Sequence, residues 1–191
     1  NPTGSHKDRM AAQILSRAVE AGASEVVAAS SGNAGLAVAA YAARAGLRCE
    51  IALTADCPGL LQQAMRSHGA VLRLFPRSLD RWPHVRERVL RDGAHTATNY
   101  LLPPVGSPPI GVEGYKPIAA ELLRDLGKAP DAVFVPTSRG DLVWGIHAGF
   151  AELQARGLAT HLPRMVVVEP LPRLARVLAG ADWRGQFDGD T

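Results

Sequence analysis

The first nine residues contain a lysine placed where it could react with a carbonyl group. Lys7 follows a turn that contains Pro2 and Gly4, and an apolar repeat with helical spacing begins directly after it. This repeat places Lys7 at the first turn of a helix, where orphan N–H groups and the positive dipole end favour a neutral amine. A neutral lysine amine can attack a carbonyl and form a Schiff base. The alternative, which Lys7 alone would favour, is a solvated lysine near a helix start.

A second candidate site is the loop Ser30-Ser31-Gly32-Asn33-Ala34-Gly35. It follows a short β-branched run and precedes an alanine-rich helix. Backbone N–H groups at such a helix start bind anions, and two hydroxyls and an amide add donors. A carboxylate or a phenolate-like oxygen would suit this loop. The alternative is an ordinary turn between a strand and a helix.

A third candidate site has the same order of strand, polar turn and helix, with Ser138, Arg139, Gly140, Asp141 and Leu142 in the turn. Ser138, Arg139 and the Gly140 amide could bind a phosphate at the helix start. Asp141 would repel a phosphate, so it must point away or cap the helix. The Arg-Gly-Asp tripeptide also matches an adhesion motif, but no signal peptide or disulfide framework supports that interpretation.

Two glycines flank an acid in Gly111-Val112-Glu113-Gly114-Tyr115-Lys116, which predicts a mobile flap. A helix-start glutamate stabilised by the dipole is the alternative.

A nucleophilic lysine, a loop for a carboxylate and another for a phosphate together indicate one cofactor. Pyridoxal 5′-phosphate needs a lysine for its aldehyde, donors for its phosphate and a polar partner for its ring oxygen.

Strands and helices alternate along the chain with short glycine or proline punctuation. Strands are expected at residues 25–30, 48–54, 70–75, 131–136 and 165–168, and an extended segment at 94–101. Helices are expected after Ser5, which can cap the first of them, and at residues 36–45, 58–67, 80–91, 111–127 (turn plus helix), 142–156 and 172–178. This alternation predicts parallel sheets with right-handed crossover helices.

The bulk composition excludes several classes of protein. With 191 residues, 47% hydrophobic and 20% charged, the chain is a globular, core-forming protein. The arginine cluster at positions 81, 86, 88 and 91 is interpreted as a solvated helix face, so no nucleic-acid partner is expected. No apolar run reaches membrane-spanning length. Cys49 and Cys57 lack metal-ligand spacing, and we expect them to be reduced, with no metal bound, in a cytoplasmic protein.

The motifs resemble those of the fold-type II pyridoxal-phosphate enzymes, the superfamily of tryptophan synthase β, cysteine synthase, threonine synthase and threonine dehydratase. Asn1-Pro2-Thr3-Gly4-Ser5-His6-Lys7-Asp8-Arg9 resembles the Schiff-base lysine motif, and residues 30–35 resemble the second motif. Glu113-Gly114-Tyr115-Lys116 and the following helix are most similar to threonine synthase. The resemblance implies that Lys7 carries the cofactor and that Asn33 faces its ring oxygen. It also implies that substrate contacts come from Ser30, Ser31, Gly32, Ala34, Glu113 and Tyr115.

The resemblance further implies an α/β fold with two open parallel-sheet sub-domains and crossover helices, seen here as a fragment without its N- and C-terminal segments. Residues 8–101 would form the smaller sub-domain, and residues 102–110 a proline-rich connection. Residues 1–7 and 111–191 would belong to the larger, phosphate-binding sub-domain. This chain departs from the family at its phosphate loop, which lacks a glycine run, and at His6, where an apolar residue or Phe is common. The resemblance also implies that the pyridine nitrogen is contacted by a C-terminal segment of the family that is expected to lie outside this sequence.

The expected activity is β-elimination or β-replacement on a small hydroxy- or O-activated amino acid by a pyridoxal-phosphate-dependent lyase or synthase. A cytoplasmic homodimer is expected, with no nucleic-acid or membrane partner. Two alternatives stay open. One is a non-catalytic pyridoxal-phosphate-binding protein of the same fold, because the phosphate loop is unusual. The other is a nicotinamide-dependent oxidoreductase, although residues 30–35 match its glycine-rich fingerprint poorly.

Overall fold

The computed structural model describes residues 1–100 and 107–182, and this part of the chain forms two compact units. Unit 1 extends to Gly111, and unit 2 begins at Val112. The boundary falls at the end of the expected connection, of which residues 102–106 lie outside the described residues. Residues 1–7 belong to unit 1. Their assignment to the larger sub-domain stays a prediction about the longer protein.

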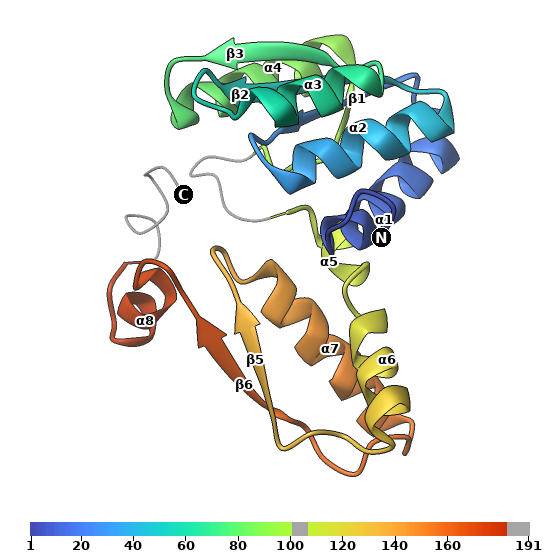
Figure 1. The fold of residues 1–191 in the computed structure, drawn as a ribbon, viewed down its shortest axis with the longest axis vertical. Helices are drawn as coiled ribbons and strands as arrows, with labels where there is room; N and C mark the ends of the chain where they lie inside the picture. Colours follow the sequence, from blue (N-terminus) through green and yellow to red (C-terminus); the bar gives the residue numbers. More distant parts are fainter. Residues whose placement is uncertain (101–106, 183–191) are drawn as a thin grey trace. The chain divides into compact units, whose positions relative to one another are not determined.

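Within the described residues, unit 1 is built on four parallel strands in the order β3-β2-β1-β4 (Figure 1). The strands are β1 (Glu25–Ala29), β2 (Arg48–Thr54), β3 (Val71–Phe75) and β4 (His95–Thr96). β1 and β2 are almost wholly buried, as expected for a parallel sheet covered on both faces. The parallel α/β architecture is therefore confirmed. The extended segment expected at 94–101 pairs as a strand over two residues only.

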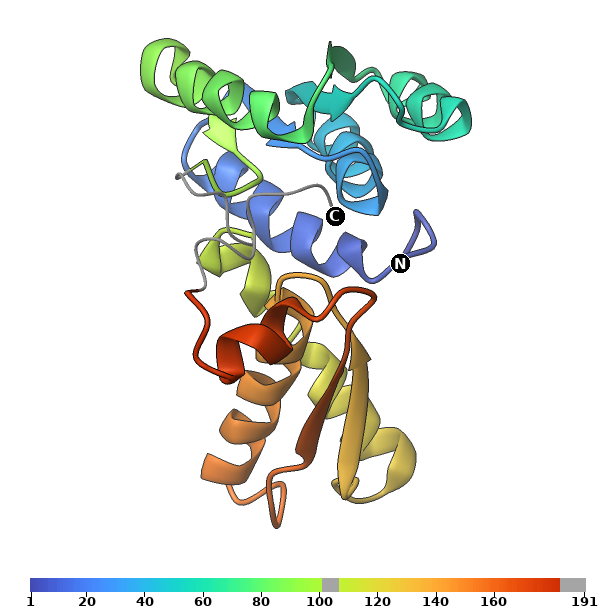
Figure 2. The same cartoon turned by 90° about the vertical axis from the view of Figure 1, so that its left-hand side faces the viewer.

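Helices cover both faces of this sheet (Figure 2). On one face α4 (Arg81–Asp92), preceded by the short helix η1 (Ser78–Asp80), packs Trp82 and Val85 against the strands. On the other face lies α2 (Asn33–Ala45), which contacts α1 (Lys7–Glu20) and α3 (Gly59–Ser67). The apolar stripe of α1 is buried as predicted, except for Val19, which is exposed. α1 and α2 begin at the same end of their pair (Figures 1 and 2).

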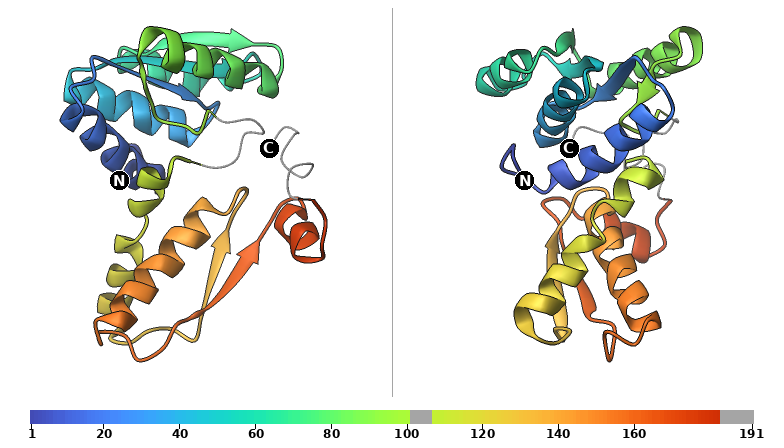
Figure 3. Two further views of the ribbon diagram at one scale, coloured as in Figure 1. Left: turned by 180° about the vertical axis from the view of Figure 1, so that it is seen from behind. Right: turned by 90° about the vertical axis from the view of Figure 1, so that its right-hand side faces the viewer.

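The described part of unit 2 contains the parallel strands β5 (Ala132–Pro136) and β6 (Arg164–Val168). Its helices are α6 (Pro117–Leu126), α7 (Asp141–Ala155) and α8 (Arg173–Leu178), while α5 (Pro109–Glu113) spans the boundary between the units. α6 and α7 lie side by side (Figure 3), and Phe150 and Ile146 of α7 fill the core with Val135 of β5. A Cβ at Gly149 would lie 2.4 Å from the Lys116 carbonyl oxygen, so glycine permits this close approach of α7.

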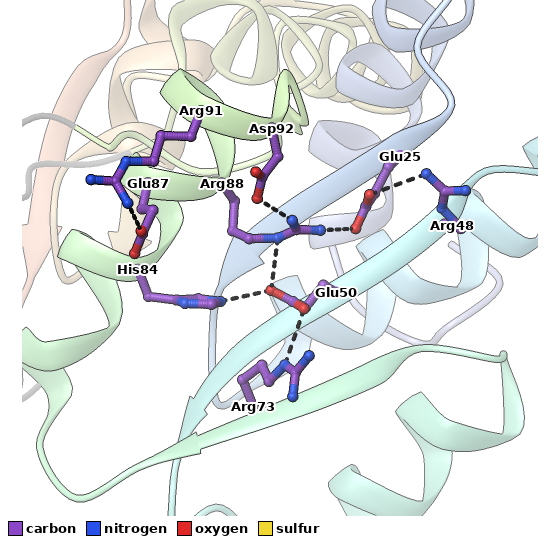
Figure 4. Close-up of polar contacts among 9 residues, drawn as sticks. All are labelled: Glu25, Arg48, Glu50, Arg73, His84, Glu87, Arg88, Arg91 and Asp92. Atoms are coloured by element: carbon purple, nitrogen blue, oxygen red, sulfur yellow. Dashed lines mark hydrogen bonds and ion pairs between the residues drawn. The ribbon is translucent and has the colours of Figure 1, made fainter.

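Two members of the arginine cluster interpreted as a solvated face, Arg88 and Arg91, form ion pairs on the α4 side of the sheet (Figure 4). Glu50 of β2 accepts a hydrogen bond from Arg73 Nε at 3.1 Å and contacts His84 Nε2 at 2.7 Å. Arg88 pairs with Glu25 and with Glu50. Only Arg86 and Arg91 of the cluster are exposed, so the interpretation was wrong for Arg81 and Arg88. The sequence reasoning failed because the partners that bury them include residues far along the chain: strand carboxylates for Arg88 and the Ser31 hydroxyl for Arg81.

No helix among residues 1–100 and 107–182 combines the length and the apolar character needed to cross a membrane. Cys49 and Cys57 are both free thiols and both buried. Burial, followed by the charges of Glu50 and Glu25, raises the pKa of Cys49 to about 12. Its thiol therefore stays protonated at neutral pH and is a poor nucleophile.

Candidate functional site

Lys7 is the first residue of α1, as the sequence predicts. A turn closed by a hydrogen bond from the Gly4 N–H to the Asn1 carbonyl oxygen (3.0 Å) leads into it. The N-cap position belongs to His6 rather than Ser5, but the Ser5 hydroxyl accepts the Lys7 N–H at 3.2 Å. Burial, then the charges of Lys7 and Arg9, lower the pKa of His6. Lys7 thus begins the helix beside an imidazole that is neutral at neutral pH.

The turn before Lys7 is held by a carboxylate on its C-terminal side. Asp8 accepts the Thr3 N–H at 2.9 Å and the Thr3 hydroxyl at 2.7 Å, and it is only 1% exposed. A buried carboxylate is tolerated where hydrogen bonds satisfy it. Residues 3–8 are therefore closed into a compact loop that fixes where the Lys7 backbone lies.

Three lysines occur in the sequence, and their surroundings differ. Hydrogen bonds from Lys116 to Glu113 and Glu152 raise the pKa of Lys116, which favours its ammonium form. Lys128 is exposed after the end of α6. Lys7 is half-buried at a helix N-terminus. Of the three, Lys7 has the setting that best favours a nucleophilic amine.

A loop connects β1 to α2, as predicted, but α2 begins at Asn33 and not at residue 36, so residues 33–35 form the first turn of the helix. The Ser30 hydroxyl accepts the N–H groups of Gly32 (3.3 Å) and Gly35 (2.9 Å). These two bonds use both acceptor positions of the hydroxyl, and its O–H remains a donor. A Cβ at Gly35 would lie 2.8 Å from the Ser30 carbonyl oxygen, so only glycine lets the helix start fold back this tightly.

Ser31 is bound on its side-chain oxygen by groups from two other segments. Its Oγ lies 2.9 Å from the Thr54 N–H nitrogen, 3.1 Å from Arg81 Nη1 and 2.8 Å from Thr54 Oγ1. The sequence analysis assigned Ser31 to the substrate carboxylate and gave no role to Thr54 or Arg81. Polar residues at the end of β2 and the start of α4 carry no motif, which is why they were missed.

Lys7 and Asn33 are brought to the same end of unit 1. Each is the first residue of its helix, α1 and α2 pack against each other, and both helices start at the same end of the pair (Figure 2). Asn33 is exposed, and its neighbours Gly32 and Ala34 are half-buried. An amine-bearing residue and an amide-bearing residue therefore begin two adjoining helices, and lysine, asparagine and helix-start N–H groups are the residue types that could bind an aldehyde and an oxyanion.

The turn at residues 138–142 connects β5 to α7, as predicted. Gly140 has a φ of +93° and donates its N–H to Thr137 Oγ1 at 3.1 Å. The Gly140 amide, expected to bind phosphate, is therefore used within the turn. Asp141 is the first residue of α7, where a carboxylate is stabilised by the helix dipole. Thr137, which is buried, escaped the sequence analysis because threonine is common at strand ends.

A cavity of about 680 Å³ lies within unit 2 beside this turn. Its lining residues are Arg139, Gly140, Asp141, Val143, Trp144, His147, Met165, Val112, Pro163 and Leu174. The volume is in the usual range for small-molecule pockets, with a few polar groups on largely apolar walls. Arg139 is thus placed at a cavity rather than on a convex surface.

The expected flap at Glu113 and Tyr115 is not an exposed loop. Tyr115 is 0% exposed between α5 and α6, and burial, then the Asp141 charge, raise its pKa. Glu113 is exposed and forms an ion pair with Lys116. Glu113 is the last residue of α5, so the alternative of a helix-start glutamate stabilised by the dipole was wrong as well. Substrate contacts from these two side chains stay a prediction.

Known proteins resemble this chain over most of its length. The family model for pyridoxal-phosphate dependent enzymes matches residues 1–185. The threonine synthases of Synechocystis sp. and Halalkalibacterium halodurans are 35% and 34% identical to it, over 87% and 86% of the chain. The chain spans 42% and 45% of their lengths. The processed form of threonine deaminase isoform 2 from Solanum lycopersicum superposes with a TM-score of 0.71 at 26% identity, covering 91% of this chain and 48% of that one.

Proposed function

The chain belongs to the pyridoxal-phosphate dependent enzyme family, and on this premise we propose that the full-length protein performs β-elimination or β-replacement on a small hydroxy- or O-activated amino acid. One observation carries the proposal. Lys7 and the Ser-Gly-Asn loop, far apart in sequence, lie at the starts of two adjoining helices in unit 1.

The residues of this site suit pyridoxal phosphate. An aldehyde requires a nucleophilic amine, which Lys7 supplies, and a ring oxygen requires a donor, which the Asn33 amide supplies. For the phosphate, unit 2 contributes the first N–H groups of α7 and the Arg139 guanidinium, which lines the cavity. Because Thr137 occupies the Gly140 amide, we assign the phosphate to Arg139, Ser138 and the N–H groups of Asp141 and Leu142.

The substrate carboxylate is assigned to the loop at residues 30–35. Three contacts fill the bonding capacity of the Ser31 hydroxyl, so Ser31 contributes through its backbone N–H. Ser30 keeps its O–H as a donor. The first N–H groups of α2 complete the set and favour a negative charge through the helix dipole.

Lys7 is assigned the proton transfers. When bound, pyridoxal phosphate supplies an electron sink for the α-carbon of an amino acid. The Lys7 Nζ then removes the α-proton and returns a proton at the same carbon. Loss of the β-substituent follows for substrates that carry a leaving group. Serine, threonine and O-activated derivatives have the required group.

The test uses the full-length holoprotein with L-serine, L-threonine and O-acetyl-L-serine in deuterated water. The proposal predicts a change in the visible absorbance of the cofactor and exchange of the α-proton. If none of the three exchanges its α-proton, the assignment fails for these substrates. The second candidate, a non-catalytic pyridoxal-phosphate-binding protein, would then account for cofactor without turnover. The commitment of the Gly140 amide to Thr137 is the observation that keeps it open.

The homodimer and the cytoplasmic location expected from the sequence also stay proposals about the full-length protein. Sedimentation of the holoprotein at several concentrations would test the first of them.

A further inference from the structure

The hydroxyl of Ser31 has all of its bonding capacity satisfied by protein groups. A hydroxyl has one donor and two acceptor positions. Both acceptor positions are taken by N–H donors, from the Thr54 backbone at 2.9 Å and Arg81 Nη1 at 3.1 Å. The Ser31 O–H must therefore donate to Thr54 Oγ1, 2.8 Å away. This assignment fixes the rotation of the side chain as well as its position.

Arg81 reaches Ser31 from the first turn of α4, and its own position is fixed. It is 7% exposed, its Nε donates to the Ser78 carbonyl oxygen at 2.9 Å, and its Nη2 donates to the Ser78 hydroxyl. Its guanidinium carbon lies 5.8 Å from the centre of the Trp82 ring. The planar fork of a guanidinium makes several directed hydrogen bonds at once, which a lysine ammonium does not reproduce.

The backbone of Ser31 is held as well. The Cys57 thiol, which is buried, contacts the Ser31 carbonyl oxygen at 3.3 Å. That carbonyl belongs to the peptide group whose N–H is the amide of Gly32. Contacts from Thr54, Cys57 and Arg81 thus fix the orientation of the loop amides just before α2 begins.

We propose that Arg81 is a positioning residue for the substrate loop: it holds Ser31, and through Ser31 it aims the loop N–H groups at the substrate carboxylate. The proposal rests on the function assigned above to residues 30–35. In this role Arg81 acts through its hydrogen bond to Ser31 and not by contact with the substrate. Its effect is on recognition of the carboxylate, not on attachment of the cofactor to Lys7.

The experiment compares L-alanine with L-alaninamide as ligands of the full-length holoprotein. Neither has a leaving group on the β-carbon, and L-alaninamide differs only in carrying a neutral carboxamide in place of the carboxylate. Arg81→Met and Ser31→Ala should each raise the dissociation constant of L-alanine about tenfold or more while that of L-alaninamide changes by less than about twofold. The fraction of cofactor attached to Lys7 should equal that of the wild type. Arg86→Met, an exposed position on the same helix, should change neither constant.

Equal weakening of both ligands by Arg81→Met would show a merely structural role and overturn the proposal, as would unchanged binding of L-alanine. If Arg81→Met does not fold, Arg81→Lys decides the matter. Arg81→Lys keeps the positive charge but loses the planar guanidinium. It must therefore raise the dissociation constant of L-alanine and not that of L-alaninamide. An equal rise for both ligands, or no rise for L-alanine, overturns the proposal. If the wild-type holoprotein binds neither compound, the function assigned to the loop fails first, and this inference fails with it.

Discussion

The carboxylate of Asp8 accepts both the backbone N–H and the hydroxyl of Thr3, at 2.9 and 2.7 Å, and so closes the loop that carries Lys7. The negative charge of Asp8 also lies in the first turn of α1, where it interacts favourably with the positive end of the helix dipole. One side chain therefore ties the turn, the helix start and the lysine backbone together.

Replacing Asp8 should loosen the lysine loop. Asp8→Asn keeps the shape and can keep both bonds, with its amide nitrogen donating to the Thr3 hydroxyl, but it removes the negative charge that strengthens them and should cost about 2 kcal/mol. Thr3→Val removes one of the two bonds and should cost about 1 kcal/mol. Thr3→Ser keeps both bonds and is the control. The free energy of unfolding of the full-length protein should therefore fall most in Asp8→Asn, less in Thr3→Val and least in Thr3→Ser. Equal free energies of unfolding for Asp8→Asn and Thr3→Ser would contradict the role assigned to the Asp8 carboxylate.

Glu50 should make the stability of unit 1 depend on pH. Burial pushes the pKa of Glu50 up, but hydrogen bonds from His84 and Arg73 and nearby positive charges outweigh it, so the pKa lies below its ordinary value of 4.5. The contribution of Glu50 is therefore present above pH 4.5 and lost as the pH falls through the lowered value.

The variant Glu50→Gln isolates this contribution. It leaves His84, Arg73 and Arg88 without the carboxylate and should cost on the order of 3 kcal/mol at neutral pH. The difference in the free energy of unfolding between wild type and Glu50→Gln should shrink as the pH falls below 4.5. A difference that stays constant through that range would show that Glu50 ionisation does not stabilise the fold.

Gly149→Ala should destabilise unit 2. The added Cβ would lie 2.4 Å from the Lys116 carbonyl oxygen and 2.9 Å from the Ala119 Cβ, so α7 would have to move away from α6. Overpacking of this kind costs about 1–3 kcal/mol. The matched control is Gly59→Ala, where the same methyl group meets nothing within 4 Å at a helix start. Urea unfolding should give a lower midpoint for Gly149→Ala than for Gly59→Ala. Similar midpoints would refute the close packing of α7 against α6.

Arg139→Ala should weaken the binding of pyridoxal phosphate. A guanidinium–phosphate contact contributes about 1.5–3 kcal/mol, so the dissociation constant should rise roughly ten- to a hundredfold. Arg164→Ala is the control, because Arg164 is exposed at the start of β6. Cofactor affinity is measured by titration of the apoprotein with pyridoxal phosphate. If both variants bind like the wild type, backbone N–H groups alone hold the phosphate.

The alternation of apolar runs with glycine and proline made most of the fold predictable from the sequence. The β1–α2 loop and the first residue of α1 were located by local patterns, which depend only on neighbours in the chain. Arg81 and Tyr115 were misjudged for one shared reason. Arg81 was assigned to a solvated helix face and Tyr115 to a flap, yet both are buried by packing that includes residues distant in sequence, and no local pattern contains that information.

The most direct test of the central claim is to locate the cofactor attachment site. The full-length holoprotein is treated with borohydride, which makes a carbonyl-derived link between cofactor and lysine permanent, and its peptides are analysed by mass spectrometry. We predict that the added mass lies on Lys7, and that Lys7→Ala folds but shows no borohydride-sensitive visible absorbance. Finding the added mass on Lys116 or Lys128 instead would contradict the account.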